Sequence, residues 1–176
     1  MANSKRIGGE YERDIAKFLT KWVSGDIKPY IFWRQDASGS IGTVMGDKNF
    51  SGDIKVVVEE YKWFQNSYSL ECKRNYDNLD FQDIFQKTKK DVLKEFWLQA
   101  NKDVKNTKKQ PILFYKKKGK QDIIGITETT LKRLKNKVNK LPCMRISYNS
   151  DNLPDIIIYN MEDFFKKVKI EDFKND

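Results

Sequence analysis

The sequence predicts a single α/β domain in which helices flank a mixed β-sheet. Helical and strand-like patterns alternate along the 176 residues, and no internal repeat or long linker divides them. Apolar residues make up 39% of the chain and aromatic residues 13%, which is enough for a packed core rather than a disordered chain.

The first half of the chain predicts one amphipathic helix followed by three strands. Near the start, apolar side chains recur at helical spacing and charged side chains occupy the opposite helical face. Runs rich in aromatic and β-branched residues favour strands, and a segment dense in Gly and Ser favours a loop. The expected elements are a helix at 9–22, a strand at 30–35, a loop at 36–52, strands at 53–60 and 68–74, and a turn at 66–67.

The second half predicts a long helix, followed by strands that alternate with shorter helices. The helical spacing and the strand-like spacing of apolar positions separate these elements. They are a helix at 79–104, strands at 110–118 and 121–127, a basic helix at 128–138, strands at 143–148 and 155–159, and a helix at 161–168.

The composition excludes several kinds of active site. The chain contains no histidine, which rules out Ser-His-Asp and Cys-His catalysis, histidine zinc ligands and a histidine base. The two cysteines, Cys72 and Cys143, form no CxxC pair, so neither a disulfide framework nor a thiolate zinc site is expected. An enzyme of this composition must use carboxylates and lysine, with a hard metal ion as the matching cofactor.

The net charge of +9 suits a polyanionic partner, because each neutralised phosphate releases counterions. A coding bias toward Lys and Asn, as in an AT-rich phage genome, would give the same charge, so charge alone leaves nucleic-acid binding open. No stretch approaches the ~20 apolar residues that span a bilayer, and the N-terminal segment lacks an apolar secretion signal. We therefore expect a cytosolic protein.

Three acidic residues and a lysine form a candidate catalytic set. Strand side chains alternate between faces, so Glu71 and Lys73 project together while Cys72 packs into the core. A hairpin would bring Asp53, at the start of the preceding strand, beside Glu71. Two neighbouring carboxylates repel each other unless a cation lies between them, and Mg²⁺ accepts such ligands. Glu12 lies at the margin of the apolar helix face, where a carboxylate needs a partner.

Each of these residues also has an ordinary structural interpretation. Glu71 and Lys73 can form a surface ion pair of little energetic value, and Glu12 can form an i,i+4 pair on a solvated helix. The basic run at 115–120 is typical of a solvated hairpin turn. Three tryptophans are expected in the core or at a dimer interface rather than as base-stacking platforms: Trp33, Trp63 and Trp97. Only the ordered set of acids favours catalysis.

The order of these residues resembles the PD-(D/E)xK nuclease superfamily. "SGD" at 51–53 followed by "ECK" at 71–73 is similar to its motif, with Gly52 in place of the usual proline. "GGEYER" at 8–13 resembles the N-terminal helix of archaeal-type and phage Holliday junction resolvases in that superfamily. Further similar segments are the Ser/Gly loop at 36–42, "FWLQA" at 96–100 before "KQPILFYKK", and "IIIYNMEDF" at 156–164.

The resemblance implies a restriction-endonuclease-like fold with a metal-dependent active site. Asp53, Glu71 and the backbone carbonyl of Cys72 would ligate one or two Mg²⁺ or Mn²⁺ ions. Lys73 would orient the attacking water and stabilise the transition state. Glu12 would complete the site, either as a ligand or through a bound water.

The resemblance also implies a division of the domain and a set of DNA contacts. It covers roughly residues 5–127 as the catalytic core, which leaves 128–176 as an α/β extension. Gln99 matches a supporting glutamine on a helix, with Gln82 and Gln86 as alternatives. The candidate DNA contacts are Arg34, Ser38, Ser40, Arg74, Lys116, Lys117 and Lys118.

By this resemblance the chain is expected to be a DNA endonuclease, most closely a Holliday junction resolvase acting in recombination or repair. Such enzymes work as symmetric homodimers, because two opposed strands of a four-way junction must be cut. The alternatives are a restriction- or repair-type nuclease of the same fold, a non-catalytic nucleic-acid-binding protein, and an unrelated basic protein with a chance motif. An active-site motif does not identify the DNA that is chosen.

Overall fold

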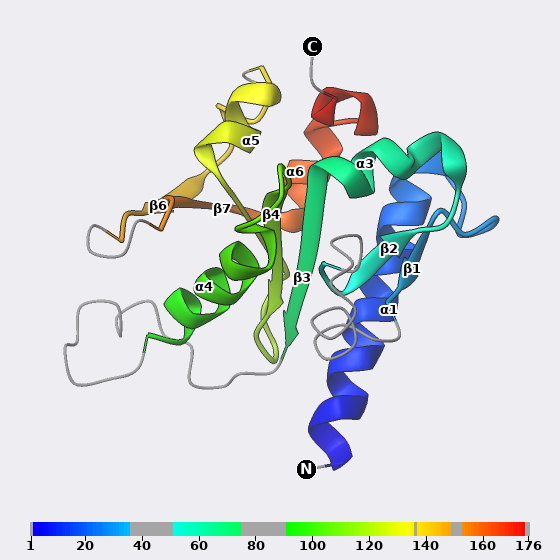
Figure 1. Ribbon diagram of the computed structural model, residues 1–176, viewed down its shortest axis with the longest axis horizontal. Coiled ribbons are helices and arrows are strands. Elements are labelled where there is room, and N and C mark those ends of the chain that lie inside the picture. Colours follow the sequence, from blue (N-terminus) through cyan, green and yellow to red (C-terminus); the bar gives the residue numbers. More distant parts are fainter. Residues whose placement is uncertain (1, 36–50, 75–90, 136, 149–152, 175–176) are drawn as a thin grey trace.

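The computed structural model describes residues 2–35, 51–74, 91–135, 137–148 and 153–174 (Figure 1). Helices and strands alternate in the order that the sequence predicts, with some short additions. The helices are α1 (Ala2–Ser24), α3 (Lys62–Ser67), α4 (Val92–Val104), α5 (Glu128–Arg133) and α6 (Met161–Lys167), with 3₁₀ turns at Glu59–Tyr61 and Ile170–Phe173. The strands are β1 (Phe32–Arg34), β2 (Ile54–Val56), β3 (Tyr68–Arg74), β4 (Gln110–Lys116), β5 (Ile123–Ile126), β6 (Cys143–Ile146) and β7 (Ile156–Asn160).

Five of the strands form one mixed sheet in the order β3-β4-β5-β7-β6, which confirms the predicted architecture. β3 and β4 run parallel, whereas the other neighbouring pairs are antiparallel. A parallel pair requires a crossover connection, and α4 lies within the crossover from β3 to β4 (Figure 1). Because β6 and β7 pair beyond β5, residues 128–176 complete the same sheet as the residues before them.

The two faces of the sheet pack against different helices, because strand side chains alternate between faces. On one face, Leu70 and Phe114 belong to a core that includes the buried residues of α1 and α6. On the other face, Leu113 and Tyr115 pack with Trp97 of α4. β3 therefore lies between two covered faces, with its outer edge directed toward β1 and β2 (Figure 1).

The three tryptophans expected in the core or at an interface occupy different environments. Trp97 is fully buried, and its Nε1 donates a hydrogen bond to the Pro154 carbonyl over 2.7 Å, so the core prediction is confirmed for this residue. Trp63 is partly buried against the core, and the Lys174 ammonium lies 5.2 Å from its ring centroid. Trp33 is 40% exposed, so of the two places expected for it, the core and a dimer interface, the core is wrong.

α1 extends beyond the predicted helix at 9–22. Its buried side chains Tyr11, Ile15 and Leu19 follow the helical spacing that was read from the sequence. Gly25 ends the helix: its φ is +79° and its N–H donates to the Lys21 carbonyl over 2.8 Å. This left-handed residue is a typical helix C-cap, which glycine adopts without steric cost. No helix among the described residues is long and apolar enough to cross a membrane.

The predicted strand at 53–60 and turn at 66–67 are wrong in part, because β2 stops at Val56 and α3 follows. Side chains of α3 bind the backbone where the strand ends: Gln65 Oε1 accepts from the Val56 N–H over 2.7 Å, and Lys62 Nζ donates to its carbonyl over 2.5 Å. The fully buried Phe64 anchors α3 to the core. These contacts are tertiary, so the β-branched run at 56–58 could not reveal them.

The ends of two further helices also differ from the prediction. α4 begins at Val92, because Asp91 is an extended N-cap whose side chain accepts from the Lys94 N–H over 2.9 Å. A helix continuous across this cap is therefore wrong, while residues 75–90 lie outside the described part. α5 ends at Arg133 rather than 138, followed by Lys135 in a left-handed conformation at φ 46°.

Candidate active site

Asp53 reaches the outer edge of β3 directly, without the predicted hairpin between the strands. β2 pairs antiparallel with β1 in a separate two-stranded sheet, so the expected β2–β3 hairpin is wrong. Instead, the Asp53 N–H donates to the Leu70 carbonyl over 2.7 Å, and Asp53 Oδ2 accepts from the Cys72 N–H over 2.8 Å. These two bonds fix the carboxylate beside the strand that carries Glu71.

Gly52 allows this close approach. Its φ is +89°, and an added Cβ would lie 2.8 Å from the Leu70 carbonyl oxygen and 2.9 Å from Ser69 Oγ. Side chains do not tolerate contacts this short, and proline cannot adopt a positive φ. Glycine is therefore required by the backbone at the position where the resembling motif has proline.

Glu71 and Lys73 project together from β3, as the alternation predicts. Lys73 Nζ lies 2.5 Å from Glu71 Oε1, and Glu71 is only 3% exposed. The ammonium also lies 5.8 Å from the centroid of the Phe96 ring of α4. The interpretation of Glu71 and Lys73 as a solvent-exposed pair is therefore wrong, because the carboxylate is buried between β3 and α4.

Electrostatics make the Glu71 carboxylate unusual. Burial raises its pKa to about 7, the nearby charge of Asp53 acts in the same direction, and Lys73 opposes the shift. Near neutral pH, Glu71 therefore holds its proton more readily than an ordinary glutamate, and further positive charge would be needed to ionise it fully. A divalent cation between Asp53 and Glu71 would supply that charge.

The donor set suits a hard divalent cation. The N–H and C=O of one strand residue point to the same side, so the Cys72 carbonyl faces the edge at which its N–H meets Asp53. Asp53, Glu71 and this carbonyl offer only oxygen ligands, which Mg²⁺ and Mn²⁺ prefer. Over the part of the chain that the structure describes, no cluster of three or more His, Cys, Asp or Glu side chains could hold a metal. Mg²⁺ commonly binds through one or two carboxylates and retains several waters, so two side chains are a sufficient set.

Glu12 approaches the same strand but pairs with a different group. Its Oε2 accepts a charged hydrogen bond from Arg34 Nε of β1. The guanidinium packs against α1 at Gly9, where an added Cβ would lie 3.2 Å from Arg34 Cζ. Burial raises the pKa of the Cys72 thiol well above its usual range, and the charges of Asp53, Glu71 and Glu12 add to this shift, so all three acids lie around Cys72. Cys72 itself packs into the core, as predicted.

A comparison with known families gives this geometry a context. A family model described as "Phage putative PDDEXK endonuclease" matches residues 3–175. The chain belongs to this family. No curated protein and no solved structure matches it.

Membership in the PDDEXK family confirms the resemblance that the motif suggested and its link to phages. It also agrees with the mixed sheet flanked by helices, which is the restriction-endonuclease-like architecture. The family is one of endonucleases, so the chain is assigned to the nuclease class of hydrolases. The match runs through residues 128–175 as well as through the expected core.

The PDDEXK chain carries a further acid that the sequence analysis missed. Asp103 of α4 lies near enough to Glu71 to raise its pKa, and Lys73 in turn lowers the pKa of Asp103 against a larger upward shift from burial. The predicted supporting residue, Gln99, lies one helical turn earlier and is exposed. Within the described residues, no hydrogen bond joins Gln99 to the acids. The i,i+4 spacing from Gln99 could have pointed to Asp103.

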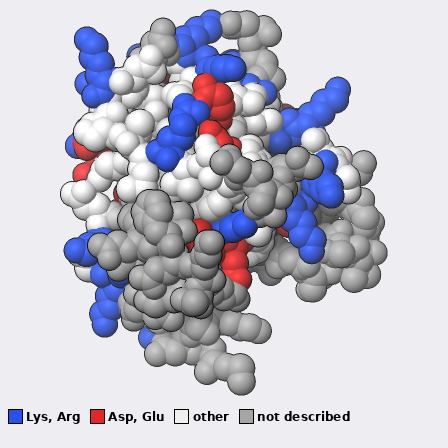
Figure 2. Space-filling view, turned by 90° about the vertical axis from the view of Figure 1, so that its left-hand side faces the viewer, with Lys and Arg blue, Asp and Glu red and all other residues white. Residues whose placement is uncertain are grey.

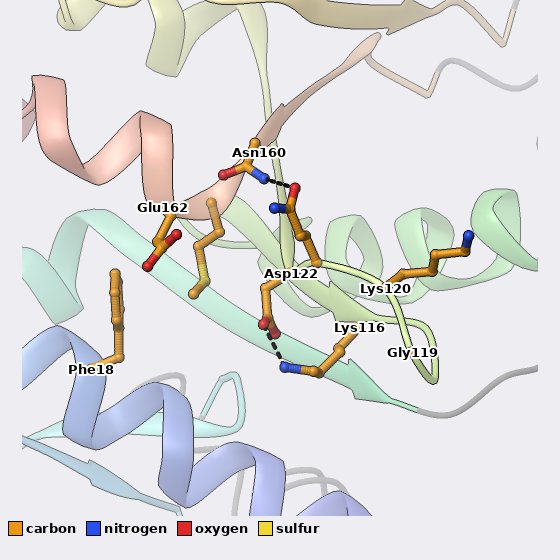
Figure 3. A pocket seen from close by; sticks show the side chains of 9 residues that line it. Phe18, Lys116, Gly119, Lys120, Asp122, Asn160 and Glu162 are labelled. Carbon is orange, nitrogen blue, oxygen red and sulfur yellow. Dashed lines mark hydrogen bonds and ion pairs between the residues drawn. The ribbon is translucent and has the colours of Figure 1, made fainter.

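The three predicted lysine contacts lie at the end of β4 and in the turn to β5. Lys116 Nζ pairs with Asp122 Oδ2 over 2.7 Å at the rim of a cavity of about 550 Å³ between α1, the β4–β5 turn and α6. Figure 3 shows this pair, with Phe18 and Glu162 on the opposite wall. None of the catalytic candidates lines this cavity, whereas Lys117 and Lys118 follow Lys116 at the turn.

The remaining predicted residues divide into two groups. Arg74 continues β3 beyond Lys73, with its Nη1 3.7 Å from Asp14 Oδ2 and its guanidinium 5.8 Å from the Tyr11 ring centroid. Ser38, Ser40, Gln82 and Gln86 lie outside the described residues. On the face that carries α4 and β6, Figure 2 shows Lys and Arg at several separate points with acidic side chains between them. Charge alone therefore marks no single DNA-binding patch on that face.

Proposed function

We propose that this PDDEXK protein is a Mg²⁺- or Mn²⁺-dependent DNA endonuclease whose catalytic residues are Asp53, Glu71 and Lys73. The observation that carries the proposal is the Glu71 carboxylate, which is buried beside Asp53 and in contact with Lys73. Burial and the Asp53 charge raise its pKa despite the contact with Lys73. A carboxylate destabilised in this way is a typical mark of a functional site. A purely structural ion pair does not need a second buried acid.

The proposed roles follow from the position of each group. Asp53, Glu71 and the Cys72 carbonyl would hold the metal ion, which when bound lowers the pKa of water and neutralises charge on the phosphate. Asp53 keeps its orientation through the Cys72 N–H, so one oxygen remains directed away from this bond. Lys73 Nζ is held against Glu71 and would donate hydrogen bonds to the attacking water or to a phosphate oxygen.

Glu12 and Asp103 are proposed as positioning residues that act through other side chains. Glu12 fixes the Arg34 guanidinium on β1, which would contact a phosphate near the cleavage site. Asp103 shares Lys73 with Glu71 and would limit how far the ammonium moves.

The DNA substrate is proposed from the resemblance to Holliday junction resolvases. We propose a branched substrate, a four-way junction in particular, cut by a homodimer in the cytoplasm of a phage host during recombination or repair. A restriction- or repair-type nuclease of the same fold is the alternative within the family. A binder without catalysis remains the alternative outside it.

Cleavage of labelled DNA tests the proposal. A four-way junction, a linear duplex and a single strand are each incubated with Mg²⁺, with Mn²⁺ and with EDTA, beside an Asp53→Asn variant. Asparagine can still accept from the Cys72 N–H, so the variant retains the local fold while losing the charge. Metal-dependent cleavage that disappears in Asp53→Asn supports the endonuclease.

The same assay separates the finer alternatives. Paired nicks in the junction alone support the resolvase, whereas equal cleavage of all three substrates removes junction specificity and keeps the nuclease. Binding without cleavage in either metal ion contradicts the catalytic proposal and leaves the non-catalytic binder.

A further inference from the structure

An exposed aromatic pair lies beside the candidate active site on β1. Trp33 is 40% exposed, and the Tyr30 ring packs edge-on against it with the centroids 4.7 Å apart. Both rings line a hollow of about 40 Å³ together with Arg13 and Lys17 of α1. This volume is close to that of one water molecule, so the hollow cannot enclose a nucleobase. The exposed face of Trp33 is therefore a platform rather than a pocket.

Three cations surround this platform. Arg13 and Lys17 are exposed one turn apart on α1, and Lys55 is the cross-strand partner of Trp33 in the β1–β2 ladder. In the segments that the structure describes, none of the three forms an ion pair. Cross-strand partners lie about 5 Å apart at Cβ, so the Lys55 ammonium is within reach of a strand that stacks on Trp33.

The platform lies close to Asp53 along the β1–β2 pair. Phe32, Ile54 and Val56 face the core, so strand alternation places Trp33 and Lys55 on the other face. The Gln35 N–H donates to the Asp53 carbonyl over 2.8 Å, so Asp53 is joined to the chain two residues beyond Trp33, just before β2 begins. Two residues of strand span about 7 Å, so the platform lies about two B-DNA base steps from the acid.

We propose that Tyr30 and Trp33, with Arg13, Lys17 and Lys55, bind an unpaired DNA strand next to the phosphate that is cut. Base stacking on an aromatic face is tolerant of sequence, and flanking cations neutralise the backbone phosphates. This inference rests on the proposed nuclease. Among the proposed branched substrates, it favours DNA that carries unpaired bases beside the cleavage position over a fully paired four-way junction. The bases of a base-paired duplex are already stacked on one another and do not present a free face to Trp33.

Charge favours DNA over a second copy of this chain as the occupant. A two-fold interface brings the same patch of both copies together. Such an interface would place the cations of one copy, Arg13, Lys17 and Lys55, against the same cations of the other copy. This contact between like charges is unfavourable. A polyanion has the complementary charge.

A DNA-binding assay under conditions that prevent cleavage tests the platform. The affinity of the full chain for a fluorescein-labelled oligothymidylate and for a blunt duplex is measured by anisotropy in EDTA. We compare Trp33→Ala, Trp33→Phe and the control Met144→Ala, which truncates a side chain of similar exposure on β6 at the far edge of the sheet. Thermal unfolding and light scattering verify that each variant is folded and report its oligomeric state.

We expect Trp33→Ala to weaken single-strand binding by about five- to 150-fold, while Trp33→Phe retains part of the affinity and Met144→Ala retains all of it. Duplex affinity should change little. A double variant, Arg13→Gln with Lys17→Gln, should reduce the dependence of log K on log salt by about 1.4 for two lost phosphate contacts, whereas Trp33→Ala should leave this slope unchanged.

Three results would overturn the platform: unchanged single-strand affinity in Trp33→Ala, an equal loss on both DNAs, or a loss explained by conversion of a dimer to monomers. The last result would identify the patch as an interface between copies. Because the binding assay contains no metal, its result does not depend on whether the protein cleaves DNA. Trp33-dependent binding by a protein that cuts no DNA would therefore contradict the nuclease alone.

Discussion

Replacing Glu71 by glutamine should remove a pH-dependent loss of stability from the metal-free protein. The pKa of Glu71 rises from its ordinary value of 4.5 to about 7 in the folded state. Between these values the folded protein holds a proton that the unfolded chain has released, so stability falls as the pH rises. One pKa unit corresponds to about 1.4 kcal/mol, which gives a loss of about 3 kcal/mol across this interval.

Urea denaturation in EDTA at a series of pH values measures this effect. Relative to wild type, Glu71→Gln should gain about 2 to 3 kcal/mol of unfolding free energy between pH 5 and pH 8. The chain contains no histidine, so the usual titrating group in this interval is absent. Taking the difference between the two proteins also cancels the contribution of residues that titrate equally in both.

Magnesium provides the second arm of this test. Saturating Mg²⁺ should stabilise the wild type most at pH 8, where Glu71 is ionised, and should have little effect on Glu71→Gln. If the difference in unfolding free energy between the two proteins stays constant from pH 5 to pH 8, the assignment of a raised pKa to Glu71 is refuted. Equal stabilisation of both by Mg²⁺ would place the ion elsewhere.

Three further changes test neighbouring contacts. Gly52→Ala should destabilise the protein by about 1–3 kcal/mol more than Gly119→Ala, because both positions have positive φ but only Gly52 is pressed against β3; urea denaturation compares them, and equal costs would contradict the steric argument. A double-mutant cycle of Glu12→Gln and Arg34→Gln should give a coupling free energy of about 1 kcal/mol, and additive effects would show that the ion pair is energetically silent. Lys73→Met should shift the pH dependence of stability to higher pH, because Lys73 lowers the pKa of Glu71, and an unchanged profile would argue against their contact.

Local sequence patterns were sufficient to predict the part of the site that lies on β3. Alternation on β3 placed Glu71 and Lys73 together, and the apolar neighbours of Cys72 placed its side chain in the core. The order of strands across the sheet, with β7 inserted between β5 and β6, has no signal of this kind. The pairing of distant strands depends on tertiary packing, which a single sequence does not encode in any short segment.

The errors arose where side chains of one element determine the structure of another. Gln65 and Lys62 end β2 at Val56 by binding its backbone, so a favourable run of valines is overridden. Asp103 was missed because a charged residue near the end of a helix is usually solvated, and only the packing of α4 against β3 brings it near Lys73. Both cases are contacts between elements, for which propensity and periodicity carry no information.

Gly52 shows what the nuclease motif requires physically in this chain. The Asp53 carboxylate must reach the Cys72 N–H, and this brings the preceding residue within contact distance of the Leu70 backbone. A proline at this position would need a different path for the chain, because its ring fixes φ near −65°. The chain instead turns through a positive φ with no side chain and presents the acid to the same strand edge. The position of the carboxylate relative to Glu71, rather than the identity of the residue before it, is therefore the property on which metal binding would depend. Gly52→Pro should displace Asp53 and weaken Mg²⁺ binding.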